Sequence, residues 1–299
     1  MGRILCPASR GCSSDGIAKH VYMISINNDT CIRCGKCQRV CPAFIPVICK
    51  DEVPALRHPE VCIECGHCVD VCPTGAYIHG AFAAEDIHAI DRSILPSPEG
   101  LMELIRSRRS NRTITSTPVP RHSLDMIQEA ARYAPTAQNS RQVHLHLITD
   151  DEGLLKVEAA TIGFFMRLAR FMLLPPVKVL LRPFLRKLYD EVPALMAMNE
   201  QFQKGQRPCI CNCTALLILS APKGYSFGAQ DCNLAYQNAS LMAESLGVSQ
   251  IYMGFVQTAM FMMGCKRAAK VLGIPKGHKA WAIMGLGMPA FKYSKYTTR

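Results

Sequence analysis

Cysteine is the residue type whose spacing most clearly predicts chemistry in this chain of 299 residues, which contains 16 of them. Residues 31–42 read CIRCGKCQRVCP, and residues 62–73 read CIECGHCVDVCP. Eight of the twelve positions are identical, and both runs have the spacing C-x2-C-x2-C-x3-C-P. Zinc sites take cysteines in pairs from separate knuckles, whereas this spacing is typical of cubane iron–sulfur clusters. The runs therefore predict a unit that carries single electrons.

In such a run three closely spaced thiolates hold one cluster, and the fourth, which precedes a proline, ligates the other cluster. The sequence therefore predicts two [4Fe–4S] clusters, each with ligands from both runs. The first ligand set is Cys31, Cys34, Cys37 and Cys72, and the second is Cys62, Cys65, Cys68 and Cys41. Gly35 and Gly66 stand between the second and third ligands, where a side chain would crowd the metal or the turn. Two structural metal knuckles are the alternative interpretation.

From about Met23 to Ile90 the chain resembles the two-cluster bacterial ferredoxins, through the two cysteine runs. The resemblance implies two pseudo-symmetric halves, each with a short hairpin and a helix. Cys49 has no matching partner in the other run, and His67 stands where the first run has a lysine. We therefore expect neither residue to be a ligand.

The composition is that of a globular chain, with 49% hydrophobic and 19% charged residues, and the length predicts two domains. The formal net charge is +11, which bound clusters and a phosphorylated cofactor would lower. Without an aromatic and basic stripe, we expect no nucleic-acid binding. The clustered cysteines and the lack of a clear signal peptide argue against a disulfide framework. No apolar stretch reaches about 18 residues, so no transmembrane helix is expected and the cytoplasm is the predicted compartment.

Changes in composition along the chain predict its organisation. Residues 1–22 are predicted to be a disordered leader, and residues 23–90 the two-cluster domain. Residues 91–100, DRSILPSPEG, contain two prolines, two serines and a glycine and are predicted to be a linker. Residues 101–299 then form the second, larger domain.

The larger domain mixes helical and strand patterns. A helix is expected from Leu101, and another is expected to begin at an N-cap at Ser123 and to end before Pro135. Residues 143–149 alternate as a strand does, and a second strand is expected at residues 280–285. The pattern predicts an α+β fold.

Four segments of this domain resemble the nitroreductase family of FMN proteins. RRSNR, at residues 108–112, resembles the first flavin motif of the family. Guanidinium groups suit the FMN phosphate, which carries about two negative charges, although a solvated basic helix end is the alternative. APTAQNSRQ, at residues 134–142, resembles the segment whose asparagine bonds the flavin ring edge from a partner subunit. This chain continues with Val143 where the family often has proline and tryptophan.

The two remaining segments follow later in the chain. Residues 228–255, GAQDCNLAYQNASLMAESLGVSQIYMGF, resemble a long helix of the family and the turn that follows it. In the family this turn brings backbone N–H groups to flavin N5, and Met253 stands where other members have an acid. Residues 272–299 resemble the closing segment, whose basic tail reaches the phosphate. The resemblance thus implies a cofactor-binding set of Arg108, Arg109, Ser110, Arg112, Asn139, Gln142, Met253, Gly254, Lys295 and Arg299.

The two resemblances together imply a two-[4Fe–4S] ferredoxin-like domain followed by a nitroreductase-like α+β domain that binds FMN. The family's flavin sites lie between subunits, so a homodimer is implied. The expected activity is reduction of a small organic acceptor, such as a nitro, quinone or unsaturated compound, with electrons from NAD(P)H or a redox protein. No side chain is predicted to act as an acid–base catalyst. The alternatives are a non-catalytic carrier between protein partners and a family member that has lost its flavin.

Two further segments are unusual. Lys156 to Tyr189 contains seven Lys or Arg residues and a single acid, and it is amphipathic and broken by prolines. A membrane-surface helix is one interpretation, but we favour a helical insert that packs at the dimer seam or over the flavin. CICNC, at residues 209–213, is expected to enter a strand with Cys209, Cys211 and Cys213 on one buried face, with a third metal site as the alternative.

Overall fold

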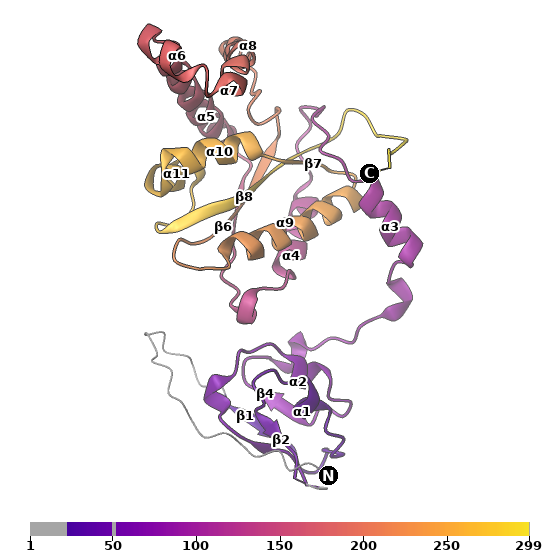
Figure 1. Cartoon of the computed structure of the whole chain (residues 1–299). Coiled ribbons are helices and arrows are strands. Elements are labelled where there is room, and N and C mark those ends of the chain that lie inside the picture. The colour runs from indigo at the N-terminus through magenta and orange to yellow at the C-terminus, as the bar shows by residue number, and fades with distance from the viewer. Residues whose placement is uncertain (1–22, 50–51, 299) are drawn as a thin grey trace. The chain divides into compact units, whose positions relative to one another are not determined.

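The computed structural model describes residues 23–49 and 52–298, which form two compact units that divide between Arg92 and Ser93 (Figure 1). This division lies inside the predicted linker, while the predicted leader, residues 1–22, lies outside the described residues. The linker is not wholly irregular, because helix α3 (Pro98–Ser107) begins within it. Ser97 accepts the N–H of Gly100 at 3.1 Å and so caps α3 three residues earlier than the sequence predicts.

The N-terminal unit repeats one pattern at a spacing of 31 residues, so that α1 begins at Lys36 and α2 at His67. Its strands are β1 (Ile24–Ile26), β2 (Pro46–Val47), β3 (Ala55–Leu56) and β4 (Tyr77–His79). Its α-helices are α1 (Lys36–Val40) and α2 (His67–Asp70), and short 3-10 turns lie at Pro59–Val61 and Ala84–Asp86.

The prediction of one hairpin in each half of this unit is wrong. Strand β1 pairs with β4 and β2 pairs with β3, both antiparallel, so every pair joins the two halves. Strands of two or three residues are too short to be stable alone, and pairing between halves gives the unit a shared core. Val69 and Tyr77 are buried in that core, against Ile24 and Ile26 of the other half.

The C-terminal unit is built on a four-stranded antiparallel sheet with the strand order β5-β6-β8-β7. The strands are β5 (His144–Ile148), β6 (Ala215–Pro222), β7 (Ser249–Tyr252) and β8 (His278–Gly287). Consequently β5 and β7 are the two edges, and β6 and β8 form the centre. The central strands carry the most deeply buried side chains of the unit.

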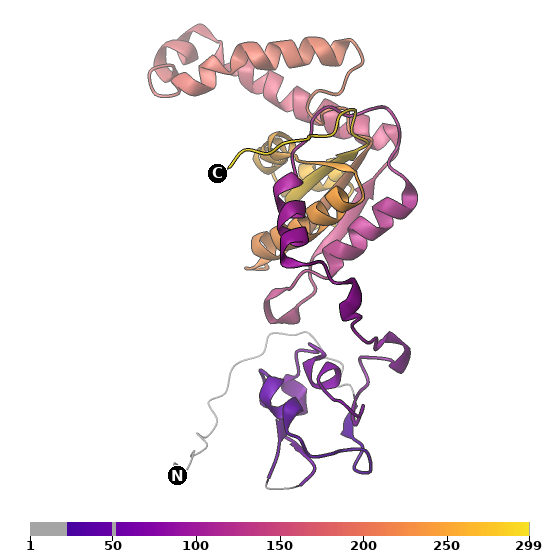
Figure 2. The ribbon, with the colours of Figure 1, turned by 90° about the vertical axis from the view of Figure 1, so that its right-hand side faces the viewer.

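Helices cover both faces of the sheet (Figures 1 and 2). Successive side chains of a strand point to opposite faces, so Leu217 and Leu219 of β6 pack with α4 and α9, whereas Leu216 and Ile218 pack with α5, α10 and α11. These helices are α4 (Arg121–Arg132), α5 (Asp151–Met172), α9 (Gly228–Ser245), α10 (Gly254–Met263) and α11 (Cys265–Leu272).

Helix α4 begins two residues before Ser123, which was the predicted N-cap. Pro120 holds the cap position with an extended backbone, which a proline favours, and Ser123 is buried inside the first turn. The predicted apolar face is present, because Leu124 and Ile127 are both buried.

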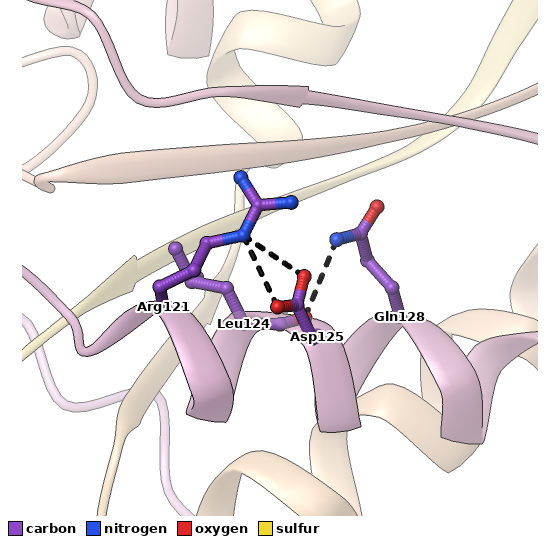
Figure 3. A network of polar contacts seen from close by, with 4 residues as sticks. All are labelled: Arg121, Leu124, Asp125 and Gln128. Atoms are coloured by element: carbon purple, nitrogen blue, oxygen red, sulfur yellow. Dashed lines mark hydrogen bonds and ion pairs between the residues drawn. The ribbon is translucent and has the colours of Figure 1, made fainter.

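The exposed side of α4 carries a local ion pair (Figure 3). The Arg121 Nε atom lies 3.0 and 3.1 Å from the two carboxylate oxygens of Asp125, one turn later. Gln128 donates to the carbonyl of Leu124 at 3.4 Å. Such an exposed pair adds only about 0.3–0.5 kcal/mol, so the buried face fixes the position of α4.

The basic insert extends beyond the sheet as a helical arm (Figures 1 and 2). The insert, residues 156–189, comprises most of α5, the helix α6 (Pro175–Leu181) and most of α7 (Arg186–Asp190), and α8 (Val192–Gln203) follows it and completes the arm. Among the described residues, no helix is both long enough and apolar enough to cross a membrane.

Candidate functional site

The eight predicted ligand cysteines form two sets in the N-terminal unit, and each set lines its own cavity. One cavity is lined by Cys31, Cys34, Cys37 and Cys72, and the other by Cys62, Cys65, Cys68 and Cys41. This grouping is the one that the spacing predicts, including the exchange of the fourth cysteine between the runs. Tyr77 lines both cavities and therefore lies between them.

The backbone around each set repeats the same left-handed turns. Arg33 and Glu64, between the first and second cysteines, have φ of 58° and 52°. Gly35 and Gly66, after the second cysteine, have φ of 70° and 77°. These dihedrals turn the chain within a few residues, so that consecutive thiols face one cavity. Their positive φ is a reason why glycine is favoured at both positions.

Several of the thiols are buried or accept backbone hydrogen bonds. The Sγ atom of Cys41 accepts the N–H of Ile45 at 3.4 Å, and that of Cys62 accepts the N–H of Glu64 at 3.4 Å. Burial raises the pKa of Cys68 to about 11. A bound metal displaces such thiol protons, and N–H donors then stabilise the thiolate charge.

The arrangement of the thiols suits a cluster better than a single ion. Within the described ranges 23–49 and 52–298, no three His, Cys, Asp or Glu side chains converge closely enough to hold one metal ion. A zinc ion would need four sulfurs at about 2.3 Å from one point. A [4Fe–4S] cluster takes one thiolate on each iron, so its four ligands surround a larger body. Four thiols lining one cavity fit that requirement.

His79 places a side-chain hydrogen-bond donor beside the second cavity, and the equivalent position of the first half has none. Its Nδ1 atom accepts the N–H of Ala81 at 3.1 Å, and its Nε2 atom lies 3.4 Å from the Sγ atom of Cys62. Because Nδ1 accepts a hydrogen bond, the ring carries its proton on Nε2 and donates it to the sulfur. Burial lowers the pKa of His79. The residue 31 positions earlier is Ile48, which has no side-chain donor.

Replacing His79 with phenylalanine is expected to lower the reduction potential of the second cluster, on the order of tens of millivolts, because the thiolate loses a donor that stabilises added negative charge. Redox titration followed by EPR measures this. The first cluster serves as the internal control, and equal shifts of both potentials would contradict the assignment.

The RRSNR segment lies beside β7 in the C-terminal unit. Ser110 forms a parallel bridge with Gln250, whose side chain is fully buried. The Nε2 atom of Gln250 donates to the carbonyl of Arg109 at 3.1 Å, and its Oε1 atom accepts the Tyr236 hydroxyl at 2.7 Å. One buried amide therefore attaches the basic segment to both β7 and α9.

The arginines of this segment do not share one environment. Arg109 and Asn111 line a cavity of about 420 Å³ together with the C-terminal end of α9 and the chain that follows β8, and neither Arg108 nor Arg112 lines it. Burial raises the pKa of Tyr236, and the charge of Arg108 opposes that rise. The Tyr236 ring lies 4.8 Å from that of Tyr252, which immediately precedes Met253.

Met253 and Gly254 lie where β7 passes into α10. Of their two backbone N–H groups, only that of Gly254 belongs to the first turn of the helix. The N–H of Met253 donates to the carbonyl of Ile283 at 2.9 Å, and its side chain packs over Gly285. Gly254 is exposed and is the first residue of α10, where N–H groups have no partner within the helix. Of the two predicted backbone donors, Gly254 is therefore the one that suits a ligand.

The segment that carries Asn139 lies at the other edge of the sheet, directly before β5. Gln138, Asn139 and Arg141 have φ of 53°, 52° and 51°, which is costly for residues other than glycine. The buried Asp231 carboxylate of α9 accepts the N–H of Ala137 at 3.3 Å and the hydroxyl of Tyr225 at 2.6 Å. These bonds hold the loop in its strained conformation.

Replacing Asp231 with asparagine is expected to weaken FMN binding about 10- to 100-fold, because hydrogen bonds to a charged group contribute about 1.5–3 kcal/mol and the loop would relax. Fluorescence titration of the apoprotein with FMN measures the change. Asn238→Ala removes a more distant α9 contact, to the carbonyl of Ala130, and is the control. Equal affinities of D231N and wild type would contradict the role of Asp231.

The remaining predicted residues are less closely held. Gln142 is half-buried and lies two residues before β5. Lys295 is exposed in the tail, where the neighbouring Tyr296 ring lies 5.5 Å from the Arg106 guanidinium. Arg299 lies outside the described residues.

The prediction that CICNC enters a strand is wrong. Residues 209–213 form turns, Cys211 has φ of 52°, and β6 begins only at Ala215. The buried Glu158 carboxylate of α5 accepts the N–H groups of Cys209 and Ile210, both at 3.0 Å, and this satisfies the turn in place of a strand partner. The three thiols therefore do not share one strand face.

Comparison with protein families also finds two parts in the chain, and the structural division falls in the interval between the two matches. Residues 105–288 match the model of the nitroreductase family, and residues 23–73 match that of the 4Fe-4S dicluster domain. This chain belongs to the nitroreductase family. The predicted α+β fold, the N-terminal dicluster domain and the oxidoreductase class are thereby confirmed.

Related nitroreductases are distant in sequence. A protein of Archaeoglobus fulgidus named for NADH dehydrogenase/NAD(P)H nitroreductase activity is 24% identical over 64% of this chain and 86% of its own length. A protein of Methanothermobacter thermautotrophicus with the same name is 26% identical over 64% of this chain and 78% of its own length. The crystal structure of a Bacteroides fragilis nitroreductase with bound FMN has a TM-score of 0.51 and 20% identity, over 67% of this chain and 94% of that one.

Sequence reasoning missed the residues of this nitroreductase that position others. Asp231 is an acid on a face of α9 that carries mostly small residues such as Cys232 and Ala235, which is a usable signal, whereas Gln250 follows a polar residue in β7 and has none. Tyr225 and His79 have no such signal, because their partners are found only in the folded chain. Asp231 and Gln250 lie within the family segment 228–255, but the resemblance assigned them no role.

Proposed function

We propose that this chain is an FMN- and iron–sulfur-dependent reductase of a small organic acceptor, of the nitro, quinone or unsaturated class. The observation that carries the proposal is one polypeptide with both a nitroreductase domain and two cavities lined by four thiols each. When bound, FMN accepts one or two electrons and each cluster carries one. Such a pair of cofactors supports delivery of single electrons to a two-electron reaction.

The residues of one edge of the sheet suit the phosphate and the ring of FMN. Arg108 and Arg112 supply guanidinium groups for the phosphate, and Lys295 adds a third cation from the tail. The Gly254 N–H, at the start of α10, is a fixed donor for a ring nitrogen, and the helix N-terminus favours negative charge there. No side chain near Gly254 is required as an acid–base catalyst in this proposal.

A second copy of the chain completes this site in our proposal. Segment 108–112 and Gly254 flank β7, whereas the Asn139 loop precedes β5 at the opposite edge. A homodimer in which one chain's Asn139 and Gln142 meet the other chain's β7 edge brings the three segments together. Support comes from the strained backbone at Asn139, in a loop that Asp231 holds through the N–H of Ala137. In the proposed dimer this loop serves the FMN site of the other chain.

The test uses the anaerobic holoprotein reduced with dithionite or with NADH, NADPH or a reduced ferredoxin. We expect a nitroaromatic, a quinone or an activated alkene to reoxidise it through repeated turnovers, with flavin and cluster absorbance recovering each time. If only protein acceptors reoxidise it, the chain is an electron carrier and the enzymatic proposal fails. If acid treatment of the purified protein releases no FMN, the flavin site itself is wrong.

A further inference from the structure

The far end of the helical arm presents large apolar side chains to solvent. Val179 and Leu180 of α6 are 79% and 68% exposed, and Phe184, in the turn before α7, is 82% exposed. Figures 1 and 2 show α6 and α7 at the end of the arm, away from the sheet. Neither the sheet nor the helices that cover it bury these side chains. We call residues 170–188 the arm tip.

Hydrogen bonds within the arm tip fix its backbone. The buried hydroxyl of Tyr189 donates to the carbonyl of Met172 at 2.9 Å, which ties α7 back to the end of α5. The N–H of Lys178 bonds the carbonyl of Leu174, and that of Leu185 bonds the carbonyl of Leu181. The apolar side chains are therefore displayed on a fixed frame.

Cations lie among these apolar side chains, and acids do not. The sequence has no Asp or Glu from residue 159 to residue 189. Within the arm tip the exposed cations are Arg170, Lys178, Arg182, Arg186 and Lys187. Three of them, Lys178, Arg182 and Arg186, line a groove of about 740 Å³ together with Leu173, Val179 and two prolines. The groove thus combines an apolar wall with three positive charges.

We propose that the arm tip binds the surface of an anionic lipid bilayer. The cations of the groove meet lipid phosphates, and Val179, Leu180 and Phe184 enter the boundary between headgroups and acyl chains. Basic and apolar residues combined in this way are typical of helices that lie on anionic membranes. Because no described helix can cross a bilayer, the attachment is peripheral.

The charge of the chain favours an anionic bilayer over a second copy of the chain as the partner of the arm tip. The whole chain has a formal net charge of +11, so another copy offers little negative charge to the arm tip, and two arm tips facing each other would repel. The exposed apolar side chains are distributed over α6, the following turn and α7, so more than one element of the arm tip carries them. A fluid bilayer accommodates such a distribution.

Flotation of the holoprotein with vesicles tests the proposal. We expect binding to vesicles of phosphatidylcholine and phosphatidylglycerol, little binding to phosphatidylcholine alone, and weaker binding at high salt. The K178Q/R182Q/R186Q variant is expected to bind on the order of 100-fold more weakly, since each cation near an anionic surface contributes roughly a factor of five. The K266Q/R267Q/K270Q variant, which removes three exposed cations from α11, is the matched control and is expected to bind close to wild type.

A second variant, V179S/L180S/F184S, tests the apolar contribution without changing charge. Its exposed positions are expected to leave circular dichroism and cluster absorbance unchanged while vesicle binding is lost. The proposal is overturned if the wild-type holoprotein does not float with anionic vesicles, or if the arm-tip and α11 charge variants weaken binding equally. It is also overturned if the serine variant converts a dimer to a monomer and vesicles bind neither form, because the arm tip would then contact a second copy.

Discussion

The Cys72→Ala variant is expected to lose the cluster that the first cysteine run holds, although Cys72 belongs to the second run. The reason is that Cys72 lines the cavity of Cys31, Cys34 and Cys37. Three thiolates leave one iron without a protein ligand, so the intact four-iron form at that site is lost or degrades. EPR spin counting of the reduced protein is expected to find one intact [4Fe–4S] cluster per chain where the wild type has two.

Double variants determine which thiols act together. The C31A/C72A variant removes two ligands of one set and is expected to keep one intact cluster, like C72A alone. The C62A/C72A variant removes one ligand from each set and is expected to keep none. The opposite order, with none left in C31A/C72A and one in C62A/C72A, would mean that each run binds its own cluster. Cys49→Ser changes an exposed cysteine outside both sets and is the control.

The R108Q/R112Q variant is expected to bind FMN about 10²- to 10⁴-fold more weakly than wild type. Each charge-assisted hydrogen bond contributes about 1.5–3 kcal/mol, and this variant removes the two guanidinium groups that we assign to the phosphate. The measurement is FMN affinity of the apoprotein by fluorescence titration, with riboflavin as a second ligand. Because riboflavin has no phosphate, its affinity is expected to change little.

Arg109→Gln is the matched comparison for this prediction. Arg109 belongs to the same segment but lines the 420 Å³ cavity, which Arg108 and Arg112 do not. FMN affinity close to wild type is therefore expected. If R109Q weakens FMN binding more than R108Q/R112Q does, the phosphate binds in the cavity of Arg109 and Asn111, and our assignment of the two arginines is wrong.

The cysteine runs show how much a local pattern can establish. Four thiols within one short run cannot move far apart, and the fourth precedes a proline that redirects the chain. Spacing therefore predicted both ligand sets, and the folded unit groups the same eight cysteines. Spacing did not predict His79, because its contact with Cys62 depends on the pairing of β1 with β4.

The flavin segments were recognisable one at a time for the same reason, since each is a short run with its own residue types. Their mutual positions were not predictable. Gln250 reaches the carbonyl of a residue 141 positions away, and Asp231 holds a loop 94 positions away. Such contacts depend on which strand lies at which edge of the sheet. The spacing of residues along the sequence does not predict that strand order.

By itself, the sequence of this nitroreductase determined the α+β fold and the presence of a dicluster domain, and it predicted the two sets of four thiols and the basic segment that we assign to a phosphate. These features follow from residue type and from distances that a few peptide bonds limit. Only the tertiary structure decided that Arg109 lines a cavity and that the N–H of Met253 donates to the carbonyl of Ile283. It also decided that the Asn139 loop lies at the opposite edge of the sheet from β7. Each of these depends on strand order and on hydrogen bonds between distant residues, which form only when the whole sheet assembles.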